Sequence, residues 1–356
     1  DARAHNDIVE TPQVMRLGDA HTALSLAPMS LSGTFEMGGQ DHFYLEGQIA
    51  MAVPGEDGAL KIYSSTQNPT EAQHLIAHLL HKPSAAVTVE VRRMGGAFGG
   101  KETQSTLIAA IAALAAEKTG RPAKLRLDRD DDMIMTGKRH DFAITYKAGF
   151  DQSGLLQSAG FELASRCCFS TDLSLAINDR AMFHSDNCYF LGAAEITSHR
   201  FRTNTVSNTA FRGFGGPQGM LGGERMMDEI AFAVDRDPLD VRLDNLYGGP
   251  GRDLTPYHQT VEDNVAGDLI ETLAASSNYR ARRAEIEAEN LGDSIIKRGL
   301  ALTPVKFGIS FTAKHLNQAG ALIHVFTDGT IQLNHGGTEM GQGLFQKVAQ
   351  VAASRF

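Results

Sequence analysis

The segment MGGAFGGKE, residues 94–102, is the stretch that decides how this chain is organised. Its four glycines in six positions indicate backbone that passes close to a bulky group, because glycine adopts unusual φ values and carries no side chain that would collide with a ligand. Before it, residues 87–92 alternate as a strand does. After it, residues 107–116 are rich in Ala, Leu and Ile and are followed by Gly120 and Pro122, as a helix should be. This segment, which we call loop 1, therefore connects a strand to a helix, and its backbone N–H groups can bind an anion.

Loop 1 also has the spacing of a phosphate-binding loop, from Gly95 to Lys101. The next residue is Glu102, however, where such loops place the Ser or Thr that binds magnesium. A carboxylate there would repel a triphosphate, so the spacing argues only weakly for a nucleotide triphosphatase. A tight turn without any ligand is an alternative that this loop, taken alone, leaves open.

The composition describes a globular protein with an excess of glycine, since 36 of its 356 residues are Gly and 42% are hydrophobic. The net charge of -9 argues against a nucleic acid or an anionic membrane as partner, and no apolar run is long enough to span a bilayer. The cysteines, Cys167, Cys168 and Cys188, lack C-x-x-C spacing, so we expect neither a thiolate zinc site nor an iron–sulfur cluster here. Reduced thiols predict a cytoplasmic location.

The rest of the pattern mixes strands and helices. Strands are predicted over residues 31–36, 43–53, 60–64, 124–127, 142–146, 303–312, 321–326 and 331–334, and helices over residues 69–80, 218–233, 264–291 and 344–355. Asn68 and Pro69 are typical of a helix start, so Gln67 is fixed at a strand-to-helix junction, although a surface amide is its simpler interpretation. The acidic run at 128–132 has the composition of a solvated face. Arg180 lies in a segment without a clean period and has an ordinary ion pair as its alternative.

Two further glycine loops follow. Loop 2 is NTAFRGFGGPQ, residues 208–218, and loop 3 is HGGTEMGQG, residues 335–343. Two aromatic rings and an arginine inside loop 2 suggest that one side chain stacks on a ring and another holds an anion. The repeated strand, glycine loop and helix imply one extended cofactor that backbone contacts from several directions.

Six strings, which together span nearly the whole chain in order, resemble the molybdenum-cofactor-binding subunit of the xanthine dehydrogenase and aldehyde oxidase family. They are FYLE (43–46), STQN (65–68), MGGAFGGKE (94–102), AFRGFGGPQ (210–218), KFGISFT (306–312) and GGTEMGQG (336–343). The resemblance implies an α+β fold of mixed sheets with packed helices, and Mo-molybdopterin as the cofactor.

The resemblance also implies roles for individual residues. The cofactor-binding positions are Gln67, Phe98, Gly99, Arg212 and Gln342, and no side chain ligates molybdenum directly, since the pterin dithiolene does so. Glu102 and Arg180 match the catalytic pair that holds a purine from its two ends. Phe214 and Phe311 match the aromatic residues that sandwich the purine, and Thr312 lies next to them.

The activity implied is oxidation of hypoxanthine and xanthine to urate, in which a metal-bound hydroxide attacks a purine carbon and a sulfido ligand takes the hydride. Arg180 would stabilise the negative charge that develops on the purine, and Glu102 would hydrogen-bond a ring nitrogen and assist its protonation. The implied electron carriers are [2Fe-2S], FAD and NAD on partner domains or a partner subunit. The implied assembly is a homodimer or a dimer of heterodimers.

The resemblance leads to further expectations about the extent of the chain. It starts at Asp1 without an initiator Met and stops at Phe356 inside a predicted helix, so we expect a piece of a larger protein. The general-base glutamate of the family would lie beyond Phe356, which predicts that this chain alone does not turn over. The expected domains are a linker (1–20), a first cofactor-binding domain (21–255), a helical connector (256–290) and the start of a second cofactor-binding domain (291–356).

One departure and two alternatives remain. Ala97 replaces a glycine that is usual in loop 1, so backbone approach there is expected to change slightly. An aldehyde oxidase-type hydroxylase is the nearest alternative, but an aldehyde pocket has little use for the pair Glu102 and Arg180. The other alternative is a non-catalytic remnant of the fold that binds no cofactor.

Overall fold

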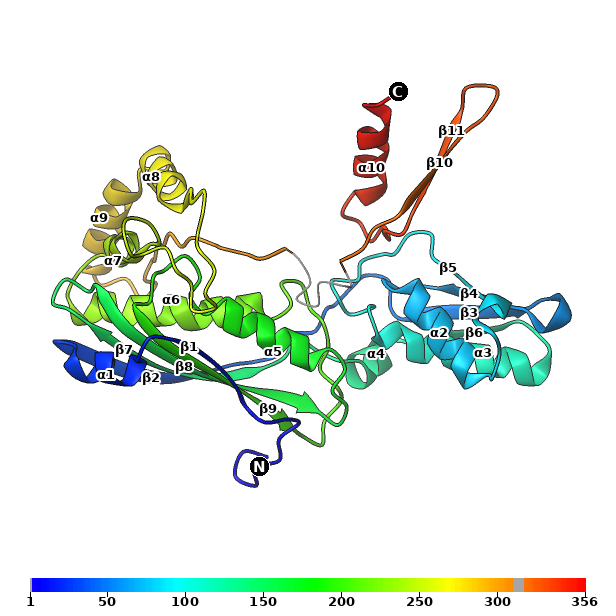
Figure 1. The fold of residues 1–356 in the computed structure, drawn as a ribbon, viewed down its shortest axis with the longest axis horizontal. Helices are drawn as coiled ribbons and strands as arrows, with labels where there is room; N and C mark the ends of the chain where they lie inside the picture. The colour runs from blue at the N-terminus through cyan, green and yellow to red at the C-terminus, as the bar shows by residue number, and fades with distance from the viewer. Residues whose placement is uncertain (1, 310–316) are drawn as a thin grey trace.

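The computed structural model describes residues 2–309 and 317–356, and it shows an α+β fold with two lobes (Figure 1). One lobe is built on a five-stranded sheet and the other on a four-stranded sheet, and a two-stranded hairpin lies near the C-terminus. The chain begins in the larger lobe, crosses to the smaller lobe for residues 49–126, and then returns. The predicted class of mixed sheets with packed helices is confirmed.

The larger lobe is organised by its sheet. Its elements are β1 (Gln13–Leu17), α1 (Ala20–Leu26), β2 (Met29–Met37), β7 (Phe142–Phe150), β8 (Leu156–Cys168), α5 (Ser174–Phe183), β9 (Ala193–Arg202), α6 (Gly216–Ala233) and α7 (Pro238–Asn245). The strand order is β1-β9-β8-β7-β2, and every neighbouring pair is antiparallel except β8 and β9, which are parallel. Helix α5 lies between β8 and β9 in the chain. It carries the chain from the end of β8 back to the edge of the sheet where β8 begins, so that β9 can run parallel to β8.

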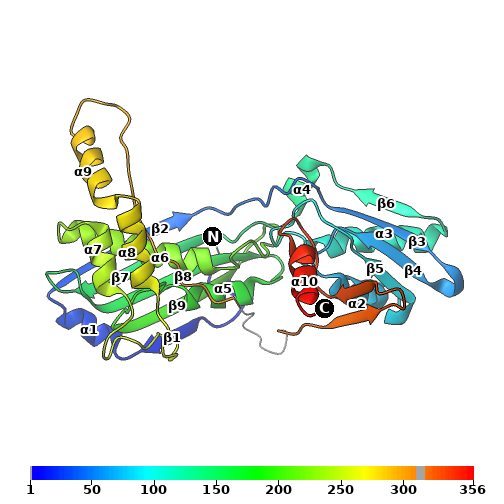
Figure 2. The same cartoon turned by 90° about the horizontal axis from the view of Figure 1, so that it is seen from above.

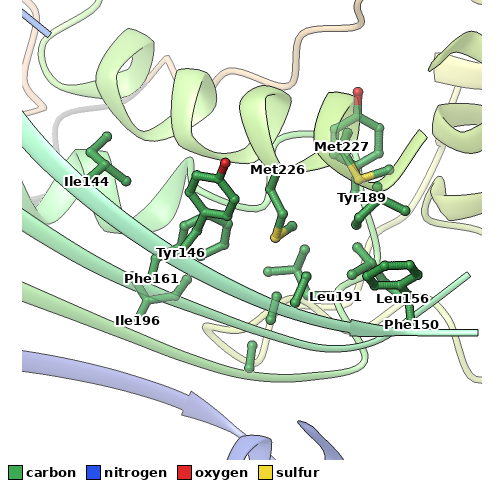
Figure 3. Close-up of a cluster of buried hydrophobic side chains, with 14 of the residues drawn as sticks. Ile144, Tyr146, Phe150, Leu156, Phe161, Tyr189, Leu191, Ile196, Met226 and Met227 are labelled. Atoms are coloured by element: carbon green, nitrogen blue, oxygen red, sulfur yellow. The ribbon is translucent and has the colours of Figure 1, made fainter. Parts of the chain in front are cut away.

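The main hydrophobic core lies between this sheet and α6 (Figure 3). Met226 and Met227 of α6 belong to the same buried cluster as Ile144, Tyr146 and Phe161 of β7 and β8. Helix α5 packs against α6 and against β8 and β9. Burying a side chain of this size stabilises the fold by roughly 1.5–3 kcal/mol, so this core fixes α5 and the loop that leads into α6.

The smaller lobe brings two chain segments to one edge of its sheet. Its elements are β3 (Ile49–Pro54), β4 (Leu60–Ser64), α2 (Pro69–Leu79), β5 (Val87–Glu90), α3 (Gln104–Thr119) and β6 (Ala123–Arg126), with short 3-10 turns at Glu56–Gly58 and Ser84–Ala86. The strand order is β5-β4-β3-β6, and β4 and β5 are parallel. The carboxyl ends of neighbouring parallel strands meet at the same edge. Gln67, which follows β4, and loop 1, which follows β5, are therefore neighbours.

The helices of the smaller lobe begin and pack as their sequences dictate. The Asn68 side chain accepts a hydrogen bond from the Glu71 N–H at 3.2 Å, and Pro69 takes the first helical position of α2. Ala109, Ala112 and Ala113 of α3 are buried against the sheet and α2. Small side chains at these positions allow the helix to approach closely, so the start of α3, next to loop 1, is held firmly.

The remaining elements flank the two lobes. They are α4 (Arg129–Met135), α8 (Ala266–Ser276), α9 (Tyr279–Asn290), β10 (Ala321–Val325), β11 (Ile331–His335) and α10 (Leu344–Ala353). Helices α8 and α9 extend from the larger lobe, as Figure 2 shows from above. Loop 3, between β11 and α10, reaches loop 1 through a hydrogen bond from Met94 N–H to Glu339 O at 2.9 Å. Among the described residues, no helix combines the length and the apolar character needed to cross a membrane.

Several local predictions were wrong. The strand expected over residues 43–53 begins only at Ile49, because Phe43 has a φ of 46° and its N–H is held by the Asp41 carboxylate. Residues 13–17, in the range predicted to be a linker, form the edge strand β1. The segment around Arg180, for which no element was predicted, is helical; its apolar residues have no clean period because α6 and the sheet both cover α5.

Three other segments also differ from expectation. The acidic run includes Asp132, which is buried and accepts hydrogen bonds from Tyr44 Oη at 2.7 Å and Gln48 N–H at 3.0 Å. The helix expected over residues 264–291 is broken at Asn278, whose φ is 52°. Residues 303–309 form no strand, and the rest of that predicted strand lies outside the described residues.

Candidate functional site

The three glycine loops meet at one cavity of about 1010 Å³. It lies between the lobes, since loop 1 belongs to the smaller lobe and loop 2 leads into α6 of the larger one. The lining residues are Phe43, Leu45, Gln67, Met94, Gly95, Gly96, Phe98, Gly99, Glu102, Ala210, Phe211, Arg212, Gly213, Phe214, Met340, Gly341 and Gln342. Seven residues singled out from the sequence, namely Gln67, Phe98, Gly99, Glu102, Arg212, Phe214 and Gln342, are thus in one place.

A direct hydrogen bond joins loops 1 and 2. The Arg212 N–H donates to Phe98 O at 2.8 Å. Gly99 has a φ of 99°, and a Cβ atom at this position would lie 2.7 Å from Ala210 O. Glycine is required there for both reasons, because an L side chain would be strained and would push the two loops apart. Ala97, by contrast, has no positive φ and is fully buried, so the extra methyl group is accommodated.

The Gln67 side chain is oriented by loop 1. Its Oε1 atom accepts hydrogen bonds from the Gly99 N–H at 3.0 Å and the Lys101 N–H at 3.3 Å, and its own backbone N–H donates to Lys101 O at 2.8 Å. With the oxygen used in this way, the Nε2 group is the part of the amide that points to other partners. No described residue accepts a hydrogen bond from it.

Three aromatic residues around the cavity have strained backbones. Phe43, Phe98 and Phe214 have φ values of 46°, 56° and 50°, a region that bulky L residues rarely adopt. All three line the cavity. Strain of this kind costs about 1–3 kcal/mol per residue and persists where the surroundings fix it, often at binding sites.

Glu102 lies at the exit of loop 1, half-buried, with no hydrogen bond or ion pair to its carboxyl group from any described residue. Burial raises the pKa of this carboxyl from its ordinary 4.5 to about 7, and the nearby carboxylates of Asp172 and Glu71 contribute in the same direction. A carboxyl group with this pKa is partly protonated at neutral pH and can act as a hydrogen-bond donor.

Arg180 of α5 lies on the other side of Phe214. Its guanidinium carbon is 5.8 Å from the centre of the Phe214 ring and 5.3 Å from that of Phe307, and Nη1 donates a hydrogen bond to Gly308 O. Arg180 is buried, and burial lowers its pKa. It lines a second cavity of about 380 Å³ instead of the larger one, and Phe214, which lines the larger cavity, is the residue of that cavity wall that Arg180 approaches.

Lys101 does not face the cavity. Its ammonium group is fully buried and donates to Glu46 O at 2.7 Å, to Ser65 Oγ at 2.9 Å and to Glu46 Oε2 at 3.2 Å. It also lies 4.7 Å from the centre of the Tyr44 ring. A lysine held in this way cannot contact a bound phosphate, which argues against the phosphate-loop interpretation.

The comparisons with known proteins agree with this arrangement. Residues 2–246 match the model of the molybdopterin cofactor-binding domain, and residues 272–356 match a second model with the same description. The chain belongs to the family of molybdopterin cofactor-binding domains.

Relatives in that family are similar over almost the whole chain. A xanthine dehydrogenase/oxidase from Felis catus is 46% identical over 354 residues, which are 99% of this chain and 26% of that protein. A xanthine dehydrogenase from Dictyostelium discoideum is 41% identical over 356 residues, again 26% of its length. The aldehyde oxidoreductase from Desulfovibrio gigas has a similar structure, with a TM-score of 0.75 and 25% identity over 92% of this chain and 35% of its own. The chain thus spans about a quarter of the length of these curated relatives.

The residues around the cavity fit a molybdopterin cofactor. Gly96, Phe98 and Gly213 line the cavity, and their backbone N–H groups donate to no acceptor in the described part of the chain. Arg212 is exposed and forms no ion pair with the described residues. These donors, together with Gln67 Nε2, match a ligand that carries oxygen atoms and negative charge along its length. These hydrogen-bond donors bind oxygen atoms, so they fit the pterin and the phosphate of the cofactor.

Gln342 lines the cavity, but both ends of its side-chain amide form hydrogen bonds within loop 3. Its Oε1 atom accepts from Met340 N–H at 2.8 Å and its Nε2 atom donates to Thr338 O at 2.9 Å, so its amide holds loop 3 in shape. Phe311 and Thr312, the two remaining predicted substrate residues, lie outside the described residues.

Sequence reasoning missed several residues of the site. Phe43 and Leu45 line the cavity, and the only signal for them was the string FYLE. His42 supports loop 2, with Nε2 2.6 Å from Ala210 O and its ring 4.6 Å from the centre of Phe211; burial lowers its pKa to about 4. Asp172 sits beside Glu102 and carried no sequence signal at all.

Proposed function

We propose that this chain is the molybdopterin-binding part of a hydroxylase that oxidises hypoxanthine and xanthine to urate. The observation that carries the proposal is that an acid without a partner among the described residues and a buried cation lie about one aromatic ring. Glu102 and Phe214 share the wall of the loop cavity, and the Arg180 guanidinium lies 5.8 Å from the Phe214 ring. The 46% identity to a xanthine dehydrogenase/oxidase supports a purine as the substrate.

When bound, the molybdopterin cofactor supplies the oxygen-insertion chemistry and accepts two electrons. Gln67 would donate a hydrogen bond from Nε2 to the metal end of the cofactor, and the Phe98, Gly99 and Arg212 backbone would contact the same end. Gln342 would hold loop 3 beside the pterin. These residues position the cofactor, since none of them supplies a titrating group.

The chain's own residues would bind and polarise the purine. Phe214 would fix the flat ring, with Phe311 and Thr312 assigned to the same task by the family resemblance, and this is an entropic contribution to the rate. Glu102, as the acid, would donate a hydrogen bond to a ring nitrogen and assist its protonation. Arg180 would stabilise the negative charge that develops on the ring, an effect that is strong because the guanidinium is buried.

We further propose that electrons leave through a [2Fe-2S] centre and FAD, with NAD as the final acceptor, on other domains or on a partner subunit. The assembly would be a homodimer or a dimer of heterodimers in the cytoplasm. Cofactor binding is divided between the domain over residues 21–255 and the one that begins at residue 291. All of these follow from the family resemblance.

Urate formation by the intact protein tests the proposal. We expect Arg180→Met to reduce kcat/KM for xanthine by roughly 10²–10³-fold, the scale for removal of one charge-stabilising group, and to reduce it much less for an aldehyde. Equal losses on both substrates would contradict a purine pocket and favour an aldehyde oxidase-type enzyme. Metal analysis of the same protein should show about one molybdenum per chain, and an absence of molybdenum would indicate a non-catalytic remnant.

A further inference from the structure

Asp172 is a half-buried carboxylate near Glu102, in the turn between β8 and α5. Its oxygens accept hydrogen bonds from Gln104 Nε2 at 2.6 Å, from Thr103 Oγ1 at 2.8 Å and from Thr209 Oγ1 at 3.2 Å. Thr103 and Gln104 directly follow Glu102, and Thr209 belongs to loop 2. Asp172 is thus anchored to the start of α3, directly after Glu102, and to loop 2.

The environments of the two carboxyl groups differ in hydrogen bonding. Burial raises the pKa of Asp172 above its ordinary 3.8, but its three side-chain donors favour the charged form. Glu102 is also half-buried and has no donor from the described residues, and partial burial raises its pKa to about 7. When two neighbouring carboxyl groups share one region, the one without donors takes the proton first.

We propose that Asp172 is a positioning residue whose anchored negative charge keeps Glu102 protonated, so that the Glu102 carboxyl group can donate a hydrogen bond to the substrate. The inference rests on the substrate role proposed for Glu102. It assigns Asp172 a task apart from contact with the substrate, since Asp172 acts through Glu102 and is absent from the cavity wall.

The other charged groups near Glu102 do not oppose this effect. Glu71 at the start of α2 acts on Glu102 in the same direction as Asp172, with a smaller contribution. Lys101, the preceding residue, directs its ammonium group to Glu46. Arg180 on α5 and Arg212 on loop 2 are not among the groups that shift the Glu102 pKa. The two groups that do act on Glu102 are therefore both acidic.

Direct titration of Glu102 in the intact protein tests the inference. With ¹³C-labelled glutamate, the carboxyl band of Glu102 is assigned by infrared difference against Glu102→Gln and followed from pH 4 to pH 9. Asp172→Asn keeps the shape of the side chain and removes its charge. We expect the midpoint for Glu102 to fall by about one pH unit, the scale of a close like-charge interaction, and Glu71→Gln to lower it by less.

Asp130→Asn is the matched control, because Asp130 is exposed on α4 and forms no hydrogen bond with the described residues. It should leave the midpoint unchanged. In the pH profile of kcat/KM, Asp172→Asn should move the limb for loss of the Glu102 proton by the same amount as the infrared midpoint. A residue with only a structural role would lower the rate without moving that limb.

The inference is overturned if Asp172→Asn folds and the Glu102 midpoint stays where it is. If that variant does not fold, Asp172→Ser decides, because it also removes the charge while its hydroxyl can still accept from the Thr103 and Gln104 donors; an unchanged Glu102 midpoint again overturns the inference. The proposed function fails separately. If the Glu102 midpoint shifts as expected but the protein does not oxidise xanthine, the role of Asp172 is supported and the assignment of a purine substrate is wrong.

Discussion

Replacement of Glu102 by Gln should stabilise the protein at alkaline pH while it removes activity. In the folded chain the Glu102 carboxyl titrates at about 7 against an ordinary value of 4.5, and this difference corresponds to roughly 3 kcal/mol. Gln has nearly the same shape and no charge. Because the protonated carboxyl and the amide are both neutral and occupy the same site, Gln should recover most of that energy, and we expect a gain of about 2–3 kcal/mol at pH 8.

The effect has a defined pH window. Between about pH 4.5 and pH 7 the folded state holds the Glu102 proton and the unfolded state does not, so stability falls as the pH rises through this range and then stays level. Glu102→Gln removes this loss. The variant should therefore match the wild type near pH 4.5 and exceed it at pH 8.

The assay is the thermal unfolding of the intact protein at pH 4.5, 6 and 8, with local hydrogen exchange of the peptides that cover residues 94–104. The difference in Tm between Glu102→Gln and the wild type should grow with pH by a few degrees. Glu56→Gln, at an exposed hairpin turn, is the control and should show no pH-dependent difference. A difference that is equal at all three pH values would refute the raised pKa of Glu102 as the cause.

Three other substitutions probe the loops. Gly99→Ala places a Cβ atom 2.7 Å from Ala210 O at a φ of 99°, so we expect loops 1 and 2 to separate and the molybdenum content of the purified protein to fall roughly tenfold; unchanged content would contradict a cofactor held by both loops. Gln67→Glu keeps the acceptor for the Gly99 N–H but removes the Nε2 donor, and should weaken cofactor retention by about tenfold with unchanged near-UV circular dichroism. Lys101→Met leaves Glu46 without its cation and should destabilise the protein by about 3 kcal/mol in urea titrations, whereas a loss confined to catalysis would place Lys101 in the site.

Much of the fold follows from local sequence signals. The α2 start at Asn68 and Pro69 and the Ala-rich α3 were predicted because capping and composition act over one or two turns. The hairpin β10–β11 follows from the turn at residues 327–330. Each of these signals is short-range, so tertiary packing has little opportunity to override it.

The errors occur where distant residues decide the outcome. Asp132 looked like part of a solvated acidic run, but Tyr44 and Gln48, more than eighty positions away, donate hydrogen bonds that allow its burial. Helix α5 has no amphipathic period, because the large-lobe sheet and α6 cover it on different sides. The role of Asp172 depends in the same way on contacts with Thr103 and Thr209 from two other segments.

The cavity itself is the clearest case of a feature that local signals cannot specify. Loop 1 belongs to the smaller lobe and loop 2 to the larger one, and they are joined by the hydrogen bond from Arg212 N–H to Phe98 O, while His42 supports loop 2 through Ala210 O. Each loop contains a phenylalanine with positive φ, a conformation that a bulky residue keeps only when its surroundings impose it. Because each loop forms part of the other's surroundings, a change in one lobe must disturb the backbone strain in the other. The site is therefore a property of the docked lobes and of neither lobe alone.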